Sequence, residues 1–447
     1  MIFNSKVKKT FDCDVLVVGG GVAGYGAAMG AGLAGANVIL TEQNGYLGGS
    51  ATAGLVCPFM TCYDTLGQEQ LIKGVFDKLI RKLVQNGDAI APEDCRKCDS
   101  FSGYKLEGHL GTTPFNREGL KVAMEQTVLE TGVNIKYHYT FLQAERKGRN
   151  ITSCYFATKN GIYKINAKAF IDCTGDAMVC ESVGGECYFS DDNNDLQPVS
   201  TFFLIDGVDK ELLDSQLIDN NNPAERAFMS AVEQAKKLGE FPCGTAKVRI
   251  YEQPYGIWSV NMCQIDKPFD VNDPDLITNA EIEGRRQCQI IFNFLKNYVT
   301  GMKNIRLLQT SESVGVRESR RIVGEYTMTA KDVQSNKRFE DTVVKLANSI
   351  DVHTSSRTVY RTYENKDYYT IPYRSLVHKD FDNVWSAGKT VSADRLALGA
   401  IRVMPPSMAM GQAAGVAASI AVKNGYTAKS TPYSTIKNIL NEQGANL

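Results

Sequence analysis

The chain has 447 residues, of which 43% are apolar and 22% are charged, and its formal net charge is −1. This length fits two or three domains with a large core. The balanced charge argues against electrostatic binding to nucleic acid or to an anionic membrane. No apolar run approaches the about 20 residues that cross a bilayer, and residues 1–11 do not resemble a signal peptide. We therefore expect a cytoplasmic protein that binds neither a membrane nor nucleic acid.

The first 42 residues predict a strand, a glycine turn, a helix and a second strand. The apolar run 15–18 leads directly into the sequence GGGVAG of residues 19–24, which opens a helix of small residues at 25–35. A second apolar run at 36–40 is followed by the acidic Glu42. This order is typical of a Rossmann-type dinucleotide site, whereas an isolated glycine pattern would indicate only an ordinary turn.

The glycines of this turn have separate roles. Gly19 permits the sharp turn, Gly21 lets the backbone approach a pyrophosphate, and Gly24 allows the helix and the strand to pack closely. The free N–H groups at the helix start attract phosphate groups. Glu42 can accept hydrogen bonds from a ribose diol, so the unit predicts a bound dinucleotide.

Two helices and a strand are predicted next along the chain. Residues 69–86 carry apolar side chains at helical spacing, which core packing explains. Asn116 is a suitable N-cap for a helix that ends near residue 132. Residues 133–137 alternate as a strand does. These elements predict further layers around the first sheet.

A β-hairpin is predicted before the next buried strand. Runs 151–158 and 163–169 flank Asn160-Gly161, which is a strong two-residue turn signal. The strand that follows ends in the sequence Thr-Gly-Asp at residues 174–176. A polar group after a buried strand is typical of a ligand site at a sheet edge.

The remaining chain divides into a polar middle segment and an apolar end. Residues 188–372 include Asp/Asn clusters at 191–195 and 219–222 among mixed strands and helices, which we interpret as a substrate or cap domain. Near the end, a buried strand at 383–387 precedes Gly388, and a helix of small residues is predicted at 407–423.

Three further motifs carry a family resemblance. Residues 313–321 read SVGVRESRR, residues 371–374 read IPYR, and residues 411–415 read GQAAG. With the glycine turn, they resemble the glutathione-reductase-type FAD-binding superfamily and, more closely, the FAD-dependent oxidoreductase family, over roughly residues 12–424. Because no second G-x-G-x-x-G occurs, a fumarate-reductase-like or oxidase-like arrangement is favoured over one with a separate NAD(P)H domain.

The resemblance implies an α/β fold with two parts. The first is a Rossmann-type FAD-binding domain with a parallel sheet and an antiparallel hairpin insertion. It is discontinuous, formed by residues 1–187 and 373–447, with an insertion at 61–110. The second is an α+β substrate or cap domain at 188–372.

The resemblance also implies FAD and the residues that hold it. The Gly48-Gly49 pair is expected to lie along the pyrophosphate, and the start of the C-terminal helix is expected to face the flavin pyrimidine. Ser50, directly after that pair, cannot form a histidyl–flavin linkage, so we expect non-covalent FAD. The expected cofactor contacts are Gly19, Gly21, Val22, Ala23, Gly24, Glu42, Gln43, Gly48, Gly49, Ser50, Phe141, Thr174, Gly175, Asp176, Gly388, Val403 and Met404.

His353 is the first catalytic candidate. It follows Ile350-Asp351-Val352, a stretch that resembles the family's Ile-Asp-x-His. In an extended segment, Asp351 lies on the same face as His353. A histidine with a pKa near neutrality is the usual proton shuttle, although a lone histidine is more often structural.

Arginines are the second catalytic candidates. Arg317, Arg321 and Arg402, with Arg320 and Arg374 beside them in the motifs, could bind a carboxylated substrate with two hydrogen bonds each. Their alternative role is to form salt bridges with acids such as Glu318, also in the motif.

The cysteines offer two weaker signals among the 12 in the chain. Cys57 and Cys62 have the C-x4-C spacing of a redox disulfide, but they lie farther from the Gly-Gly pair than in glutathione-reductase-type enzymes. Cys95 and Cys98 form a single C-x-x-C, and a metal site usually needs two more ligands. Buried or loop thiols are favoured in both cases, so we expect no metal.

These observations predict an FAD-dependent oxidoreductase that transfers a hydride between FAD and a small polar or anionic molecule. The alternative is a flavin-fold protein with a non-redox, cofactor-biosynthetic or RNA-modifying role. The balanced charge argues against RNA modification. The sequence specifies neither the substrate, nor the electron donor or acceptor, and an oligomer is compatible with it.

Overall fold

The computed structural model describes residues 6–60, 62–95, 111–189, 196–216, 228–265, 270–353, 358–361 and 368–447. Seven strands of this described part form the first sheet, in the order β3-β2-β1-β6-β5-β4, with β17 also paired to β6. Strands β3, β2, β1, β6 and β17 are parallel to one another. The bounds are β1 Lys9–Val18, β2 Val38–Glu42, β3 Asn134–Tyr137, β4 Thr140–Lys147, β5 Asn150–Thr158, β6 Gly161–Asp172 and β17 Val384–Ser386.

The long strand β6 joins two kinds of pairing. Its first half pairs antiparallel with β5 across the predicted Asn160-Gly161 turn, and its last residues pair parallel with β17. The hairpin therefore extends the sheet away from the ends of the parallel strands, where the ligand site is expected. The predicted α/β class with a parallel sheet and an antiparallel hairpin is confirmed.

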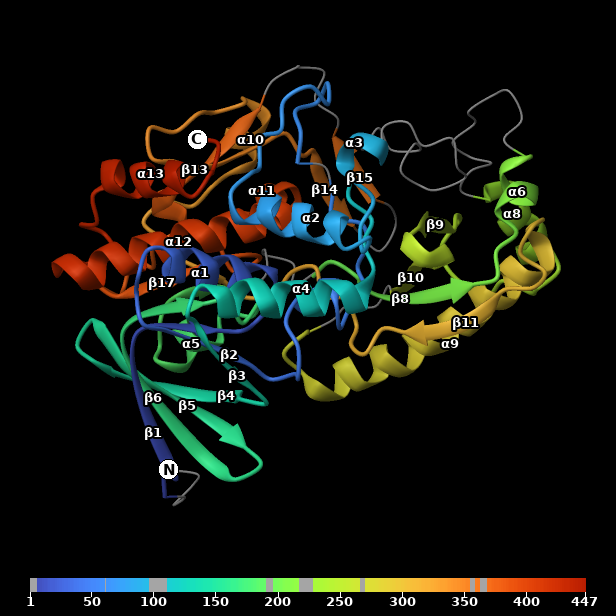
Figure 1. Ribbon diagram of the computed structural model, residues 1–447. Coiled ribbons are helices and arrows are strands. Elements are labelled where there is room, and N and C mark those ends of the chain that lie inside the picture. Colours follow the sequence, from blue (N-terminus) through green and yellow to red (C-terminus); the bar gives the residue numbers. More distant parts are fainter. Residues whose placement is uncertain are drawn as a thin grey trace.

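Helices α1 (Val22–Leu33), α2 (Val75–Gln85), α4 (Arg117–Glu130) and α12 (Met404–Asn424) pack together over one face of this sheet (Figure 1). Asn116 caps α4 as expected, since its side chain accepts a hydrogen bond from the Gly119 N–H at 2.9 Å. The helix expected at 69–86 begins only at Val75, because Gly74 adopts a left-handed φ of 68°.

The contact between α1 and α12 depends on small residues. A Cβ atom at Gly26 would overlap the carbonyl oxygen of Met408, and one at Gly411 would overlap that of Ala23. Gly415 is packed against Ala27 in the same way, one turn farther along both helices. The two helices are therefore parallel and begin at the same end.

Buried side-chain amides join these helices to the C-terminal residues. Gln412 in α12 accepts a hydrogen bond from the Val75 N–H at 3.2 Å and donates one to Gln443 at 2.9 Å. Gln443 in turn donates to the Gly30 carbonyl at 3.1 Å. Each amide therefore satisfies a backbone group of a neighbouring helix, which fixes their relative positions.

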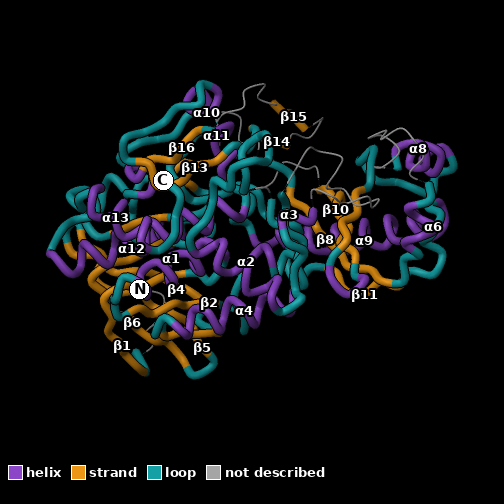
Figure 2. Tube along the Cα trace, turned by 45° about the horizontal axis from the view of Figure 1, so that its top comes forward, coloured by secondary structure: helices purple, strands orange, loops and turns teal. Residues whose placement is uncertain are grey.

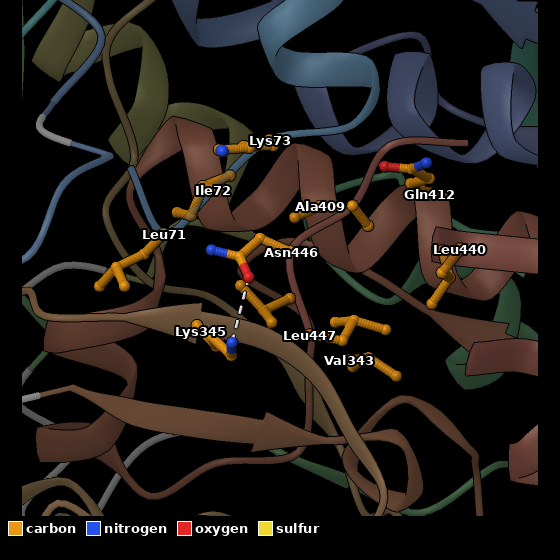
Figure 3. Close-up of a pocket in the computed structure, with 12 residues that line it drawn as sticks. Leu71, Ile72, Lys73, Val343, Lys345, Ala409, Gln412, Leu440, Asn446 and Leu447 are labelled. Carbon is orange, nitrogen blue, oxygen red and sulfur yellow. Dashed lines mark hydrogen bonds between the residues drawn. The ribbon is translucent and has the colours of Figure 1, made fainter. Parts of the chain in front are cut away.

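The C-terminal residues seal the core beside α12. Figure 3 shows Asn446 and Leu447 between α12, residues 71–73 and strand β13 (Thr342–Leu346), with a hydrogen bond of 3.1 Å from Lys345 Nζ to Asn446 Oδ1. The space left there is about 10 Å³, which suits a single water molecule at most. This pocket is a packing feature rather than a ligand site.

A second, antiparallel sheet, here called the cap sheet, consists of β11-β8-β10-β9. Its bounds are β8 Val199–Asp206, β9 Arg249–Glu252, β10 Trp258–Ile265 and β11 Arg306–Thr310. One face packs Phe203, Ile205 and Val260 against Ile291 and Phe294 of α9 (Pro274–Tyr298). Helices α6 (Lys210–Asp214) and α8 (Met229–Lys237) lie at the far end of this unit, to one side of the first sheet (Figures 1 and 2).

Residues beyond about 320 return to the first unit. Val343, Ile350 and Ile371 belong to the same apolar cluster as the first parallel strands and α12. The elements of this part are α10 Ala330–Gln334, α11 Arg395–Ile401, β12 Arg321–Ile322, β13 Thr342–Leu346, β14 Ile350–His353, β15 Thr358–Arg361 and β16 Tyr369–Pro372. The boundaries expected for the cap at 188 and 372 stay predictions, but the cap core comes from the first part of that range. The Asp/Asn clusters at 191–195 and 219–222 lie outside the described residues.

Short elements complete the described chain: η1 Gly49–Ala51, α3 Pro92–Cys95, α5 Met178–Ser182, β7 Cys187–Tyr188, η3 Pro254–Gly256, η4 Tyr373–Leu376 and α13 Tyr433–Glu442. In the ranges the structure describes, every helix is too short or too polar to cross a membrane.

We expect Gly26→Ala to lower the free energy of unfolding by roughly 1–3 kcal/mol, because the added methyl forces α1 away from the Met408 carbonyl. Leu33→Ala is the matched control. Leu33 lies in the same helix but is 42% exposed, so its replacement should change stability by less than about 0.5 kcal/mol. Thermal unfolding of both variants measures the difference, and equal melting temperatures would contradict the close packing.

Candidate functional site

A cavity of about 1000 Å³ runs from the glycine turn after β1 to the cap sheet. Its walls come from the ends of the parallel strands, the N-termini of α1 and α12, the loop 313–317 and one face of β8, β9 and β10. Pockets for drug-sized ligands measure about 300–1,000 Å³, so this cavity has room for a large ligand. Its position at the carboxyl ends of parallel strands is where open α/β sheets bind cofactors.

Two glycine-rich segments lie side by side at one end of this cavity. Gly19 turns with a φ of 100°, and the Gly48 N–H donates to the Gly20 carbonyl at 2.9 Å. A Cβ atom on Gly49 would lie 2.9 Å from Gly21 Cα, whereas a Cβ on Gly21 would meet nothing closer than 3.9 Å. Gly21 therefore leaves backbone exposed toward the cavity, at the first turn of α1, as a bound pyrophosphate requires.

Glu42 lies at the cavity wall beside this turn and is 7% exposed. It accepts hydrogen bonds of 2.8 Å from the Gly20 and Asn44 N–H groups, through different carboxylate oxygens. Burial raises the pKa of this carboxyl, and the backbone donors act against that rise. The Asn44 side-chain amide also donates to Oε1 at 2.9 Å, so Oε2 is the oxygen that keeps acceptor capacity. The residue can therefore bind a ribose hydroxyl through Oε2 and also hold the glycine turn.

The ends of β6 and β17 form the next part of the wall. Asp172 is fully buried and accepts hydrogen bonds from Thr174 and from the first N–H groups of α5. This network orders the Thr174–Asp176 turn. Lys389 follows Gly388 in the loop after β17 and forms an ion pair of 3.2 Å with Asp176 of this turn.

The N-terminus of α12 faces the middle of the cavity. Val403 is its N-cap and makes no side-chain capping bond, while Met404 and Ser407 also line the cavity. The helix begins three residues earlier than the 407 start expected from the sequence. Pro405 and Pro406 suit its first turn because their missing N–H groups cost no helical hydrogen bond there, and the Ser407 N–H donates to the Val403 carbonyl at 3.2 Å. The positive end of the helix dipole therefore faces the ligand space and favours negative charge there.

His353, Asp351 and Arg402 meet in the cavity wall beside the α12 N-terminus, which Arg402 directly precedes. His353 Nε2 lies 3.3 Å from Asp351 Oδ1, and Arg402 donates to the Asp351 carbonyl at 3.1 Å and to its Oδ2 at 3.4 Å. Burial opposes ionisation of Asp351, yet His353 and Arg402 hold its pKa well below the usual range. Burial likewise lowers the pKa of His353, against the attraction of Asp351. The imidazole is thus neutral at pH 7, with Asp351 fixing its orientation.

A buried relay behind this cluster was not expected from the sequence. Gln197 Oε1 accepts hydrogen bonds from the backbone N–H of His353 at 3.1 Å and from the Arg402 guanidinium at 3.4 Å. Its own amide donates to Glu318 Oε2 at 2.9 Å, and Glu318 pairs with Arg395 at 3.3 Å. The sequence predicts Glu318 only as an ion-pair partner of the motif arginines. No local pattern around Gln197 indicates the relay, because its partners are distant in sequence.

Most of the expected cofactor contacts line the cavity: Gly19, Gly21, Val22, Ala23, Glu42, Gln43, Gly49, Ser50, Phe141, Thr174, Gly175, Asp176, Gly388, Val403 and Met404. Gly24 and Gly48 do not line it. A Cβ on Gly24 would overlap the Gly19 carbonyl, so Gly24 serves close packing. Gly48 adopts a φ of 113° and positions Gly49.

The arginine candidates separate. Arg317 and Arg402 line the cavity beside His353. Arg321 lies 2% exposed in β12, paired with β7, and is not part of the cavity wall. Arg374 forms an ion pair of 3.0 Å with Asp341 on the protein surface. It therefore has the alternative role considered for these arginines, a salt bridge rather than substrate binding. Burial in a sheet, rather than ligand contact, therefore explains Arg321.

The cysteine hypotheses receive no support from the described residues. Burial raises the pKa of both Cys57 and Cys62 to about 12, and both thiols are free. Cys57 lines the cavity and Cys62 does not. Cys95 is buried, whereas Cys98 lies outside the described residues. Within the described ranges, no group of three or more His, Cys, Asp or Glu side chains could hold a metal ion.

Comparison with known proteins agrees with this geometry. The model of the FAD dependent oxidoreductase family matches residues 14–440. The chain belongs to this family. Its cofactor is therefore FAD, and the glycine cradle, the Glu42 carboxylate and the α12 N-terminus fit that molecule. FAD, when bound, supplies the two-electron redox chemistry.

Solved structures resemble this fold at low sequence identity. A geranylgeranyl bacteriochlorophyll reductase-like protein from Thermoplasma acidophilum has a TM-score of 0.51 and 12% identity, over 97% of this chain and 83% of that one. A p-nitrophenol 4-monooxygenase from Pseudomonas putida has a TM-score of 0.49 and 11% identity, over 97% and 85%. No protein of curated function matches the sequence. The fumarate-reductase-like arrangement stays a prediction, because these likenesses concern the fold alone.

We expect Glu42→Ala to weaken FAD binding about tenfold or more, since a hydrogen bond to a charged group contributes about 1.5–3 kcal/mol. Titration of the apoprotein with FAD measures the change. Asp14→Ala is the control: Asp14 pairs with Lys168 at 2.8 Å, outside the cavity wall, and its loss should leave FAD affinity unchanged. Equal affinity of the Glu42 variant and the wild type would mean that this carboxylate does not bind the cofactor.

Proposed function

We propose that this protein transfers a hydride between non-covalently bound FAD and a small polar or anionic substrate. The observation that carries the proposal is the continuity of one cavity. It joins the glycine cradle at Gly21 to the His353–Asp351 pair and to a polar face of the cap sheet. A cofactor and a substrate can therefore meet in this one cavity.

His353 is proposed as the group that takes or gives the proton. When a hydride leaves a C–H bond of an alcohol or amine, a proton must also leave the neighbouring oxygen or nitrogen. A neutral imidazole in the cavity wall can accept it, and Asp351 at 3.3 Å stabilises the resulting imidazolium. In the reverse direction the same pair returns the proton to the product.

The charge of the wall supports an anionic or polar substrate. Arg317 and Arg402 lie beside His353 in the cavity wall, and both His353 and Arg402 contact the carboxylate of Asp351. Arg317 donates a hydrogen bond to the Pro198 carbonyl, which orients its guanidinium. Half-buried positive charge in a cavity is stabilised when an anion binds there.

We expect acid precipitation to release all of the flavin as FAD, since Ser50 rather than a histidine follows Gly49. The supernatant should contain about one FAD for each chain, measured by absorption and chromatography. Flavin that stays in the pellet would contradict non-covalent binding, and FMN in the supernatant would contradict the choice of cofactor.

The redox function is tested by anaerobic bleaching of the FAD-loaded protein with carboxylic acids, hydroxy acids, amines and sugars. We expect one class to reduce the flavin, or to reoxidise it after chemical reduction if the reaction runs the other way. A panel in which no compound changes the redox state would contradict the proposed function.

We expect His353→Gln to slow flavin reduction by the active compound by about 10²–10⁴-fold, the usual contribution of a proton-transferring group. FAD content should be unchanged. His138→Asn is the control, because His138 lies outside the cavity wall and its φ of 61° suits asparagine. In the wild type, the oxidation rate should fall as the pH drops through the lowered pKa of His353, and the variant should lack that limb. A variant with the wild-type profile would exclude His353 as the proton acceptor.

A further inference from the structure

The cavity-facing side of the cap sheet has an unusual composition. Phe203, Ile205 and Val260 alternate toward α9, so the residues between them point to the cavity. On β8 these are Ser200 and Phe202, and on β9 they are Arg249 and Tyr251. A sheet with one face on its own core and a largely polar face on a cavity is arranged to contact a ligand.

A β-bulge on β10 increases the polarity of this face. Val260 pairs with Phe203 and Cys263 pairs with Thr201, so two residues of β10 lie opposite one residue of β8. Because of the bulge, Val260 and Cys263 both remain in the apolar core, although they are three residues apart. Asn261 and Gln264 consequently both line the cavity. Bulges near active sites commonly redirect side chains in this way.

Arg249 lies directly across from Asn261 in the β9–β10 register. Directly opposed residues have Cβ atoms about 4.5–5.5 Å apart, so the guanidinium and the amide are neighbours on the cavity face. The start of β9 is also close to the catalytic cluster, since the charge of Asp351 acts on Lys247, two residues before Arg249. The cap sheet thus adds positive charge to the wall that already contains Arg317 and Arg402.

We propose that Arg249, flanked by the amides of Asn261 and Gln264, binds the carboxylate of a carboxylic-acid substrate. This assignment rests on the proposed function and names its substrate class. Arg317 and Arg402 are tied by hydrogen bonds to the Pro198 carbonyl and to Asp351, where they shape the proton-transfer cluster. The planar guanidinium of Arg249 matches a carboxylate with two parallel hydrogen bonds, and the amides can donate to its remaining lone pairs.

The test uses the FAD-loaded protein titrated with benzoate, phenylacetate, malonate and succinate, each compared with its uncharged amide at fixed ionic strength. Perturbation of the flavin absorption spectrum reports binding. We expect at least one acid to bind the wild type about tenfold or more tightly than its amide, as charge-assisted hydrogen bonds imply. In Arg249→Gln this preference should fall to about threefold or less, while amide binding is unchanged.

Three further variants complete the test, and the first of them keeps it decisive if Arg249→Gln fails to fold. Asn261→Asp is nearly isosteric and places a negative charge beside the guanidinium, so it should weaken acid binding and spare the amide. Arg285→Gln is the matched control: Arg285 pairs with Glu281 at 3.1 Å on the exposed side of α9 and should leave the preference intact. Arg249→Lys should restore only part of it, because lysine cannot form the two parallel bonds.

An unchanged acid-over-amide preference in Arg249→Gln, or in Asn261→Asp when the first variant does not fold, would overturn the assignment. So would the absence of any acid preference in the wild type. These failures differ from failure of the proposed function. If acids bind through Arg249 but no compound in the bleaching panel exchanges electrons with the flavin, the redox function fails. If a substrate reduces wild type and Arg249→Gln equally well, the carboxylate site fails and the redox function stands.

Discussion

The close approach of α1 and α12 determines where the ligand site lies. Glycines at 26, 30, 411 and 415 remove the side chains that would separate the two backbones. Because the helices are parallel, both direct the positive ends of their dipoles to the same cavity. The two ends nevertheless lie against different parts of the ligand space. One faces the glycine turn at Gly21 and the other faces the middle of the cavity at Val403. Larger residues at these positions would move both ends at once.

The second constraint is that the charged side chains around the His353–Asp351 pair are largely removed from water. Asp351, Arg402, Glu318 and Arg395 are all largely buried, and a buried charge is tolerated only with partners. The Gln197 amide links the two ion pairs and also accepts the His353 N–H. The position of His353 therefore depends in part on Gln197, Glu318 and Arg395, which lie outside the cavity wall. Their hydrogen bonds hold the backbone of His353, while Asp351 contacts its imidazole.

The sequence predicted the parts of the structure that depend on local backbone requirements. The glycine turn, the Asn116 cap, the Asn160-Gly161 hairpin and Glu42 each follow from a conformational or hydrogen-bonding need that a few adjacent residues reveal. These features predicted a dinucleotide site, whereas FAD and the two-part fold were expected from the family resemblance. The sequence could not show that Arg317 lines the cavity whereas Arg321 lies in the short buried strand β12. Both arginines belong to the same motif, and their spacing along it does not indicate which one faces a ligand.

The cap face was beyond such reasoning for a physical reason. A bulge changes which side chains of a strand face the ligand, and it is specified by pairing with a distant strand rather than by its own residues. Without the bulge, strict alternation would place Gln264 in the apolar core beside Val260. Cys263 would then face the cavity instead of the core. The partner strand β8, more than 50 residues earlier in the chain, decides the outcome. The glycine cradle near the N-terminus is therefore encoded locally, whereas the composition of the cap-sheet wall is set by long-range pairing. That separation allows the cap strands to vary without disturbing the glycine cradle or the α1–α12 contact that holds it.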